Sequence, residues 1–413
     1  MDFPIDVVRD AFPALSLTDK GRARVYLDNP AGTQVPRAVA EAAASCLLQT
    51  NANLGGFFVT SIEAEAIVER AHQAMAEFVG AASFREVVAG PSMTSLTFQF
   101  SRSLGRTFSR GDELVVTRMD HDGNISPWLA LAEDLGLTVR WVPFDAQTWT
   151  IQPSELERAL SPKTRIVALN YASNLTGSIN DLRPLIDMAH AAGALTYVDA
   201  VQFAPHQPID VLALDCDFLC CSSYKFFGPH LGILWGRETL LQDLYAYKVR
   251  PQTAALPWKF EVGTPQIEML AALDSTVAYF DWLGSQCGAN GTRRERILGA
   301  YAAAAHWERT LTARLVDGLQ QFPGVTILGI TDPARFDERV PTVSFVHKAR
   351  SPIEIAKHLA QRNIFVWSGH NFALEIVRQL NVDEELGVIR IGMAHYNTPE
   401  EIDAALEALQ EIL

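Results

Sequence analysis

The residues from Ala194 to Arg237, ALTYVDAVQFAPHQPIDVLALDCDFLCCSSYKFFGPHLGILWGR, contain three short apolar runs that each lead into polar or turn-forming residues. The first run, Leu195–Val198, ends at Asp199. The second run, Phe218–Cys221, is followed by two serines, a tyrosine and Lys225, and a Gly-Pro turn then leads into the third. Such runs are typical of buried strands. Because open α/β sheets place their sites at the ends of strands, the acid and the lysine are predicted to share a site.

This arrangement suits pyridoxal phosphate. A lysine in a water-poor pocket loses its proton readily and can form a Schiff base with an aldehyde. Asp199 would keep the pyridine nitrogen protonated, which makes the ring an electron sink for a substrate carbanion. The hydroxyls of Ser222 and Tyr224, just before Lys225, could hold the phosphate. The alternative is a surface lysine and a strand-capping aspartate, but apolar and aromatic residues rather than charges surround Lys225.

The overall composition favours a globular enzyme over a nucleic-acid-binding or membrane protein. The length of 413 residues suggests two or three domains, and a composition of 48% hydrophobic and 20% charged residues is ordinary for a globular protein. The formal net charge is −14 and no basic run is present, so the footprint of a nucleic-acid binder is missing. No apolar stretch approaches the roughly 20 residues that span a bilayer. The first residues lack the pattern of a signal peptide. We expect a cytoplasmic protein.

The cysteines predict no metal site. Cys216, Cys220 and Cys221 cluster in or beside the second apolar run, where small thiols pack well. Two of them are neighbours in sequence and therefore point to opposite faces of a strand, and no zinc-type spacing is completed. We interpret these three residues as core.

The motifs around the lysine resemble a known family. Asp199-x-x-Gln202, then Ser222-x-Tyr224-Lys225, then Gly-Pro, resemble the class V aminotransferases, and within them the cysteine desulfurase and selenocysteine lyase group. That group has histidine where this chain has Tyr224. The resemblance implies a pyridoxal 5'-phosphate enzyme of fold type I, an α/β protein with a large domain containing a mostly parallel seven-stranded sheet and a small C-terminal α+β domain.

The pattern along the chain is consistent with that architecture. From residue 84, short apolar runs alternate with helices, as expected for a parallel sheet. Toward the C-terminus, strands are expected at Val325–Leu328, Pro341–His347, Ile364–Trp367 and Gly387–Met393. We predict an N-terminal segment (1–30) that packs near the small domain, a large cofactor-binding domain (31–270), and a small domain with a linking helix (271–413).

Two turns are candidates for the phosphate. The segment Gly90–Ser95 leads into a helix N-terminus, which offers free backbone N–H groups to an anion. By the family resemblance, Met93 (backbone) and Thr94 (hydroxyl) would hold the phosphate there. Phe260–Gln266 resembles the family's Phe-Glu-x-Gly-Thr-Pro loop, whose threonine, here Thr264, reaches the phosphate of the partner subunit. The resemblance thus implies a homodimer with shared active sites.

Further matches to the family's motifs indicate which residues would contact the cofactor ring. The run from Asp120 to Trp128 resembles the family's Glu-His-x-x-Asn-x-x-Pro-Trp, in which the histidine, here His121, stacks on the pyridine and can help to move protons. A loop histidine without this role is the alternative. Asn174, within Ser-Asn-x-x-Gly, is implied to hydrogen-bond the ring oxygen, with Gln202 at the same edge.

Some of the candidate substrate-binding residues lie where this sequence departs from the family's motifs. Arg390 lies in an otherwise apolar strand, and a buried guanidinium needs an anion, best a carboxylate, although a structural salt bridge is the alternative. Asn29 lies in the segment that the family places at the mouth of the site. In the family's Arg-x-Gly-His-His-Cys-Ala loop the cysteine attacks the substrate sulfur, but here Trp367 and Phe372 replace the arginine and the cysteine.

We therefore predict an amino-acid enzyme in which Lys225, His121 and Asp199 are catalytic and the persulfide route is lost. The simplest remaining reaction is β-elimination, which cleaves the C–S bond of a cysteine derivative. Aromatic Phe57, Phe58, Trp367 and Phe372 indicate a bulkier or less polar substrate than free cysteine. Transamination, epimerisation, and desulfuration or selenocysteine lysis by another thiol remain alternatives, as does a regulatory protein that binds the cofactor without turnover.

Overall fold

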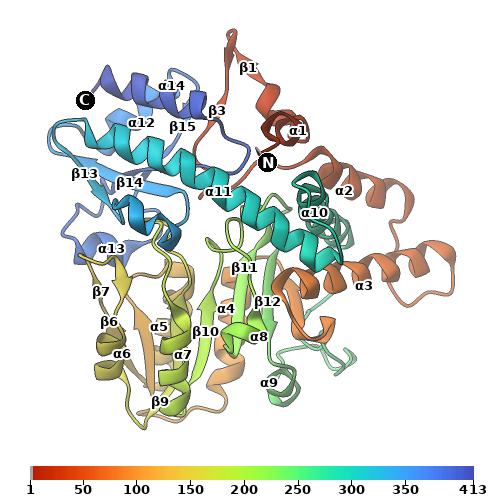
Figure 1. Cartoon of the computed structure of the whole chain (residues 1–413). Coiled ribbons are helices and arrows are strands. Elements are labelled where there is room, and N and C mark those ends of the chain that lie inside the picture. Colours follow the sequence, from red (N-terminus) through yellow and green to blue (C-terminus); the bar gives the residue numbers. More distant parts are fainter. Residues whose placement is uncertain (1–2) are drawn as a thin grey trace.

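The computed structural model describes residues 3–413 and contains two main sheets, of seven and four strands, with helices packed around them (Figure 1). The larger sheet has seven strands, in the order β4-β12-β11-β10-β9-β5-β6. Only β12 runs antiparallel to its neighbours, so the predicted mostly parallel seven-stranded sheet is confirmed. Its strands are β4 (Val87–Gly90), β5 (Glu113–Thr117), β6 (Thr138–Val142), β9 (Thr164–Asn170), β10 (Leu195–Asp199), β11 (Phe218–Ser222) and β12 (Gly232–Gly236).

Helices cover both faces of this sheet. Along β5, Leu114 and Val116 belong to one hydrophobic cluster and Val115 to another, because successive side chains of a strand point to opposite faces. This explains why the central strands are uninterrupted apolar runs. The helices around the sheet are α2 (Arg37–Gln49), α3 (Val59–Val79), α4 (Met93–Gly105), α5 (Ser126–Leu135), α6 (Pro153–Ala159), α7 (Leu182–Ala191), α8 (Val211–Leu214), α9 (Glu238–Asp243) and α10 (Ile267–Gln286).

The C-terminal part forms the second sheet, which is antiparallel and has the order β13-β14-β17-β16. The long helix α11 runs from the larger sheet to this smaller one (Figure 1). The elements of this part are α11 (Arg293–Gln320), β13 (Val325–Leu328), η5 (Pro333–Glu338), β14 (Thr342–His347), α12 (Pro352–Ala360), β15 (Ile364–Phe365), β16 (Trp367–Gly369), α13 (Leu374–Gln379), β17 (Val388–Gly392) and α14 (Pro399–Gln410).

The chain's N-terminal segment is attached to these C-terminal elements. The short strand β3 (Val25–Tyr26) pairs in parallel with β15, and Asp28 forms a bridge with Gly392 of β17. The single strand expected at 364–367 is therefore wrong: it is divided into β15, which pairs with β3, and β16, which pairs with β17. The proposed boundaries near residues 30 and 270 stay a prediction.

The remaining elements are short, and they are α1 (Ile5–Asp10), η1 (Pro13–Ser16), β1 (Thr18–Asp19), β2 (Arg22–Ala23), η2 (Phe84–Glu86), η3 (Asp122–Asn124), β7 (Phe144–Asp145), β8 (Thr150–Ile151) and η4 (Ser223–Lys225). None of the helices within residues 3–413 combines the length and the apolar character that crossing a membrane requires. The same residues contain no group of three or more histidine, cysteine or acidic side chains placed to hold a metal ion.

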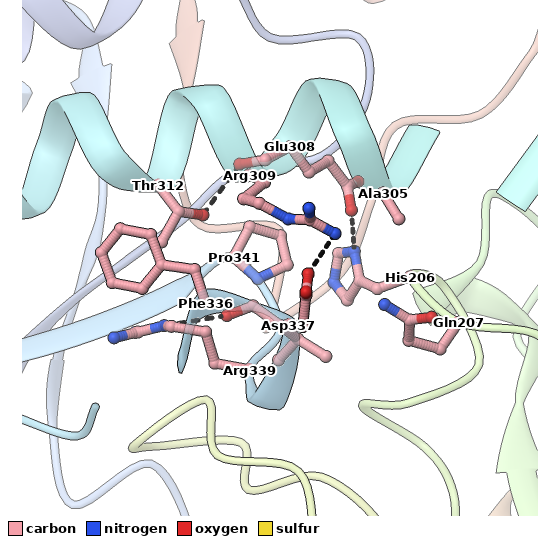
Figure 2. Close-up of a pocket in the computed structure, with 11 residues that line it drawn as sticks. His206, Gln207, Ala305, Glu308, Arg309, Thr312, Phe336, Asp337, Arg339 and Pro341 are labelled. Carbon is pink, nitrogen blue, oxygen red and sulfur yellow. Dashed lines mark hydrogen bonds and ion pairs between the residues drawn. The ribbon is translucent and has the colours of Figure 1, made fainter. Parts of the chain in front are cut away.

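A buried ion pair joins the larger sheet to α11 (Figure 2). His206, in the segment after β10, contacts Glu308 of α11 with 3.0 Å between Nδ1 and Oε2, and both side chains are buried. One helical position further on, Arg309 pairs with Asp337 at the surface. Arg339 is also buried, and its guanidinium donates to backbone carbonyls. This pocket is small, about 20 Å³, which is room for one water molecule.

Candidate active site

A cavity of about 540 Å³ lies where three parallel strands end. Its walls include Asn170 at the end of β9, Asp199 at the end of β10 and Ser222 at the end of β11. The predicted site residues that line it are Met93, Thr94, His121, Asn174, Asp199, Gln202, Ser222, Tyr224, Lys225, Trp367, Phe372 and Arg390. The structure thus brings together twelve of the predicted residues, from sequence positions almost 300 residues apart.

Lys225 ends η4, directly after β11, and its amine is buried. Burial and the nearby Arg390 lower the pKa of Lys225 to about 7, although Asp199 and Asp28 oppose the shift. Its Nζ donates hydrogen bonds to the backbone carbonyls of Pro30 and Ala31, the latter at 3.0 Å. A lysine of this kind carries an unprotonated, nucleophilic amine in a large fraction of molecules at neutral pH.

Asp199 is the last residue of β10 and is almost fully buried. Burial raises its pKa to about 6, while the backbone N–H of Val201, 2.8 Å from Oδ1, and the charge of Lys225 counteract the rise. A cationic donor in the cavity would bring this pKa down again. The carboxylate is therefore suited to a protonated ring nitrogen.

The start of α4 forms the predicted phosphate turn. The Ser92 side chain caps the helix by accepting from the N–H of Ser95 at 3.1 Å, and Met93 and Thr94 follow as the first helical residues. Gly232 of β12 lies so close that a Cβ there would be 2.2 Å from the Met93 nitrogen. Only glycine, which has no side chain, fits at this position of β12. The start of α4 can therefore lie close against the strand, and its free backbone N–H groups reach the cavity.

Tyr224 lies beside this turn. Its ring stacks on His230 with 4.8 Å between ring centroids, and its backbone carbonyl accepts from the N–H of Thr33 at 3.1 Å. Burial raises the pKa of the Tyr224 hydroxyl, so this group remains a donor. The hydroxyls of Ser222 and Tyr224 and the N-terminus of α4 together could hold a phosphate.

His121 is neutral in this environment. Burial, with the charges of Lys225 and Arg390, lowers its pKa to about 3. Its Nδ1 accepts from the backbone N–H of Gly123 at 2.9 Å, so Nε2 carries the proton. The His121 ring lies 5.6 Å from the ring of Phe372. A flat, neutral imidazole on the cavity wall can cover an aromatic ligand.

Four buried polar atoms of the cavity have no hydrogen-bond partner within residues 3–413: Asn174 Oδ1, Gln202 Oε1, Asn371 Oδ1 and Arg390 Nε. The other ends of these groups are fixed, since Asn174 donates to the carbonyl of Asn371 at 2.7 Å and Gln202 to that of Pro30 at 3.1 Å. Leaving buried polar atoms unpaired is costly, so native proteins rarely do it without a ligand. The residues present therefore fit a polar cofactor and substrate.

Arg390 lies in β17 and is buried, and its Nη1 donates to the Asn174 carbonyl at 3.0 Å. Burial lowers its pKa to about 10, although Asp28 and Tyr224 favour the charged form. It forms no ion pair within residues 3–413. The guanidinium can therefore receive an anion from outside the chain, as the sequence predicts.

The loop after β16 forms the outer wall. Trp367 and Phe372 are 52% and 65% exposed. Asn371 and Phe372 both have positive φ angles, 53° and 57°, which is uncommon for residues other than glycine. The N–H of Asp122 donates to the Phe372 carbonyl at 2.7 Å. This loop is thus tied to the residues around His121.

Two predicted site residues lie outside the cavity. Asn29 is buried, and its amide bonds the carbonyls of Tyr26 and Gly392 and the side chain of Asn397, so it ties β3 to the C-terminal part and has no group free for substrate. Its neighbours in sequence line the cavity instead. Thr264 is exposed in a separate pocket of about 310 Å³ beside the phosphate turn.

The aromatic residues Phe57 and Phe58 also lie elsewhere, fully exposed in one case and largely exposed in the other. Conversely, the sequence reasoning missed Asp122 and Asn371, which line the cavity. The former follows His121 directly, so its position in a recognised motif was the available signal. No local signal distinguished Asn371.

Comparisons with known proteins agree with this geometry. The model of the class-V aminotransferase family matches residues 25–405. The chain belongs to this family and is a pyridoxal phosphate-dependent enzyme of fold type I, with pyridoxal 5'-phosphate as its cofactor.

Relatives narrow the group. The chain is 33% identical to the aminotransferase-like protein FGM3 of Gibberella zeae, over all of this chain and 99% of the relative. It is 32% identical to a cysteine desulfurase of Pectobacterium carotovorum, over all of this chain and 98% of the relative.

Among solved structures, the cysteine desulfurase CsdA of Escherichia coli superimposes with a TM-score of 0.85 at 27% identity. The apo cysteine desulfurase of Thermococcus onnurineus gives 0.88 at 28% identity. Both cover 100% of this chain and 98% of the solved one. The protein is thus cysteine desulfurase-like.

Proposed function

We propose that the protein is a β-lyase that cleaves the C–S bond of a cysteine derivative, releasing a thiol, pyruvate and ammonia. The observation that carries this proposal is the absence of a thiol from the cavity wall: none of the cysteines within residues 3–413 lines it. Phe372 stands where the resembling desulfurases carry their sulfur-accepting cysteine. The described cavity wall thus offers residues that could bind an amino acid but no thiol that could accept its sulfur.

The cofactor would be held by residues that the cavity already gathers. Asp199 would pair with the ring nitrogen, Asn174 and Gln202 with the ring hydroxyl edge, and His121 would cover the ring face. The residues proposed for the phosphate are Met93, Thr94, Ser222 and Tyr224, with Thr264 of a second subunit. When bound, the cofactor withdraws electrons from the substrate Cα, which stabilises negative charge there.

Lys225 would act as the base of the reaction. Its amine would remove the proton from the substrate Cα. The electron pair left at Cα would then form a double bond to Cβ as the sulfur leaves Cβ with the C–S electrons and becomes the thiol, and water hydrolyses the released enamine to pyruvate and ammonia. The same amine can return a proton, because its lowered pKa lets it exchange protons near neutrality.

Arg390 would bind the substrate carboxylate. Its Nε has no partner within residues 3–413, and two parallel hydrogen bonds to a carboxylate satisfy a guanidinium best. With the carboxylate fixed at Arg390 and the amine at Lys225, the side chain of the substrate is left to point along the remaining wall. That wall contains His121, Trp367 and Phe372.

Transamination is the second candidate, because the aminotransferase-like protein of Gibberella zeae is among the most similar relatives. Epimerisation uses the same proton removal. Desulfuration by another thiol is less well supported. Burial raises the pKa of Cys220 and Cys221 far above the usual range, so neither supplies a ready thiolate.

A product assay distinguishes these reactions. Purified enzyme is incubated with L-cysteine and with a panel of S-substituted cysteines, and pyruvate, alanine and the cofactor absorbance are followed together. We expect pyruvate and ammonia in equal amounts. Turnover only with an added keto acid would instead establish an aminotransferase, racemised substrate an epimerase, and alanine from L-cysteine a desulfurase.

A further inference from the structure

The outer half of the cavity carries a carboxylate that no protein cation neutralises. Asp122 lines the cavity and its Oδ2 accepts from the Ser126 hydroxyl at 2.6 Å. Its backbone N–H is fixed by the bond to the Phe372 carbonyl. Within residues 3–413, Asp122 belongs to no ion pair and its Oδ1 accepts no hydrogen bond. The side chain is therefore held in place with one oxygen free.

A second free acceptor lies on the same wall. Asn371 is 6% exposed, and its Nδ2 donates to the Gly369 carbonyl at 2.8 Å. Because a carbonyl can only accept, the nitrogen of the Asn371 amide must face Gly369, and the oxygen of the amide faces the opposite way. That end, Oδ1, is buried without a partner in the part of the chain that the structure describes. A ligand donor at this place would remove the cost of the unpaired oxygen.

Aromatic rings complete this part of the cavity. The exposed rings of Trp367 and Phe372 lie on the wall with Asp122 and Asn371. Aromatic faces carry partial negative charge and attract cations, and the indole ring does so best. The two oxygen acceptors and the two aromatic rings therefore all favour the same kind of ligand group, one that is positively charged and donates hydrogen bonds.

The other charges of the cavity are already assigned. If the proposed function holds, Lys225 and Asp199 engage the cofactor and Arg390 engages the substrate carboxylate, while His121 is neutral. Asp122 is then the one remaining charge among the described lining residues. We propose that the outer half of the cavity, at Asp122, Asn371, Trp367 and Phe372, binds a substrate side chain that ends in a cationic nitrogen.

Three probes of similar size test this subsite on the holoenzyme. S-(2-Aminoethyl)-L-cysteine ends in a cation, S-propyl-L-cysteine is its neutral match, and S-(2-carboxyethyl)-L-cysteine ends in an anion. The change in cofactor absorbance gives a Kd for each probe, whichever reaction follows, and pyruvate release gives kcat/KM. We expect both measures to favour the cation over the neutral probe by about tenfold, and the anion to be worst.

Variants of Asp122 test whether this residue causes the preference for the cationic probe. Asp122→Asn keeps the shape and the bond to Ser126 but removes the charge, so the ratio of neutral to cationic Kd values should fall about tenfold, to near one. Asp122→Lys should make the anionic probe the best of the three. Asp134→Asn, an exposed aspartate at the far end of α5, is the matched control and should leave all three ratios unchanged.

The outcomes separate the two proposals. A cationic preference that depends on Asp122 but comes without pyruvate would support the subsite and overturn the β-lyase. Pyruvate release with equal Kd values for all three probes would support the lyase and overturn the subsite. A preference that persists unchanged in Asp122→Asn would also overturn the subsite.

Discussion

Lys225 combines a buried amine with two carbonyl acceptors, from Pro30 and Ala31. Its pKa of about 7 means that the amine is mostly charged at pH 6 and mostly neutral at pH 8. Only the neutral amine attacks an aldehyde. We therefore expect cofactor-free protein to capture pyridoxal phosphate about tenfold faster at pH 8 than at pH 6, with little further gain above pH 8.

Cofactor absorbance after mixing measures this rate. A lysine with an ordinary pKa would instead give a rate that keeps rising to pH 10, which would contradict the assignment. Lys225→Ala is the control, and it should show no capture at any pH.

Phe372 is the residue at which the proposed reaction and desulfuration diverge. Its side chain is 65% exposed and its backbone carbonyl is held by Asp122, so a smaller side chain should be tolerated. We expect Phe372→Cys to release alanine and sulfide from L-cysteine, with a dithiol reductant, at least about tenfold faster than the wild type.

Phe372→Ser is the matched control because it has the size of cysteine but no thiol. If both variants release alanine equally, the thiol at this position is not the deciding feature. If neither does, more than one substitution separates this chain from the desulfurases.

At the level of elements, the pair His206–Glu308 is a buried link between the segment after β10 and α11 (Figure 2). Removing one member of a buried pair leaves the other charge or dipole unpaired and costs about 3 kcal/mol. Glu308→Ala should therefore lower the Tm clearly. Arg309→Ala removes the neighbouring exposed pair with Asp337 and should cost at most about 1 kcal/mol.

Thermal unfolding of the two variants side by side provides the measurement. Equal shifts in Tm would show that the buried pair contributes no more than the exposed one. Because both residues lie within α11 (Arg293–Gln320), far from its ends, the change in helix propensity on mutation to alanine affects both variants in a similar way.

Much of the architecture could be predicted from the sequence, for a physical reason. Strands buried on both faces, such as β5, must be continuous apolar runs, and the polar residues that follow them mark the sheet edge that carries the site. The division of 364–369 between β15 and β16 could not be predicted. It depends on pairing with β3, more than 300 residues earlier in the chain, and no local pattern encodes such a partner.

The same limit applies to the site. Lys225 and Asp199 were predictable because their chemistry follows from their own position at strand ends. Asn29 was not, because its role depends on Gly392 and Asn397, two partners far along the chain that occupy its amide. The candidate role of Asn371 could be inferred only from the folded chain, in which its side-chain oxygen has no hydrogen-bond partner within residues 3–413.

On the scale of the whole molecule, the exposed loop with Thr264 leads us to expect a homodimer of shared sites. Thr264→Asp would place a negative charge against the phosphate of the partner and should abolish activity, as should Lys225→Ala. Mixed and re-associated, the two inactive variants should recover about a quarter of wild-type activity, because half of the dimers are hybrids with one intact site each.

Steady-state pyruvate release before and after mixing provides the measurement, with sedimentation to establish the dimer. A mixture that remains inactive, although hybrid dimers form, would mean that Thr264 serves its own subunit. Each variant mixed with itself is the control.

The attachment of β3 to β15, and of Asp28 to Gly392, also determines the order in which the protein can mature on the ribosome. Lys225, Asp199 and the phosphate turn leave the exit tunnel while residues 364–392 are still untranslated. Until those arrive, the segment that carries Pro30 and Ala31 has no strand to pair with, and one wall of the cavity is missing. We therefore expect a nascent chain to retain the cofactor poorly, and holoenzyme to form only when synthesis is almost complete.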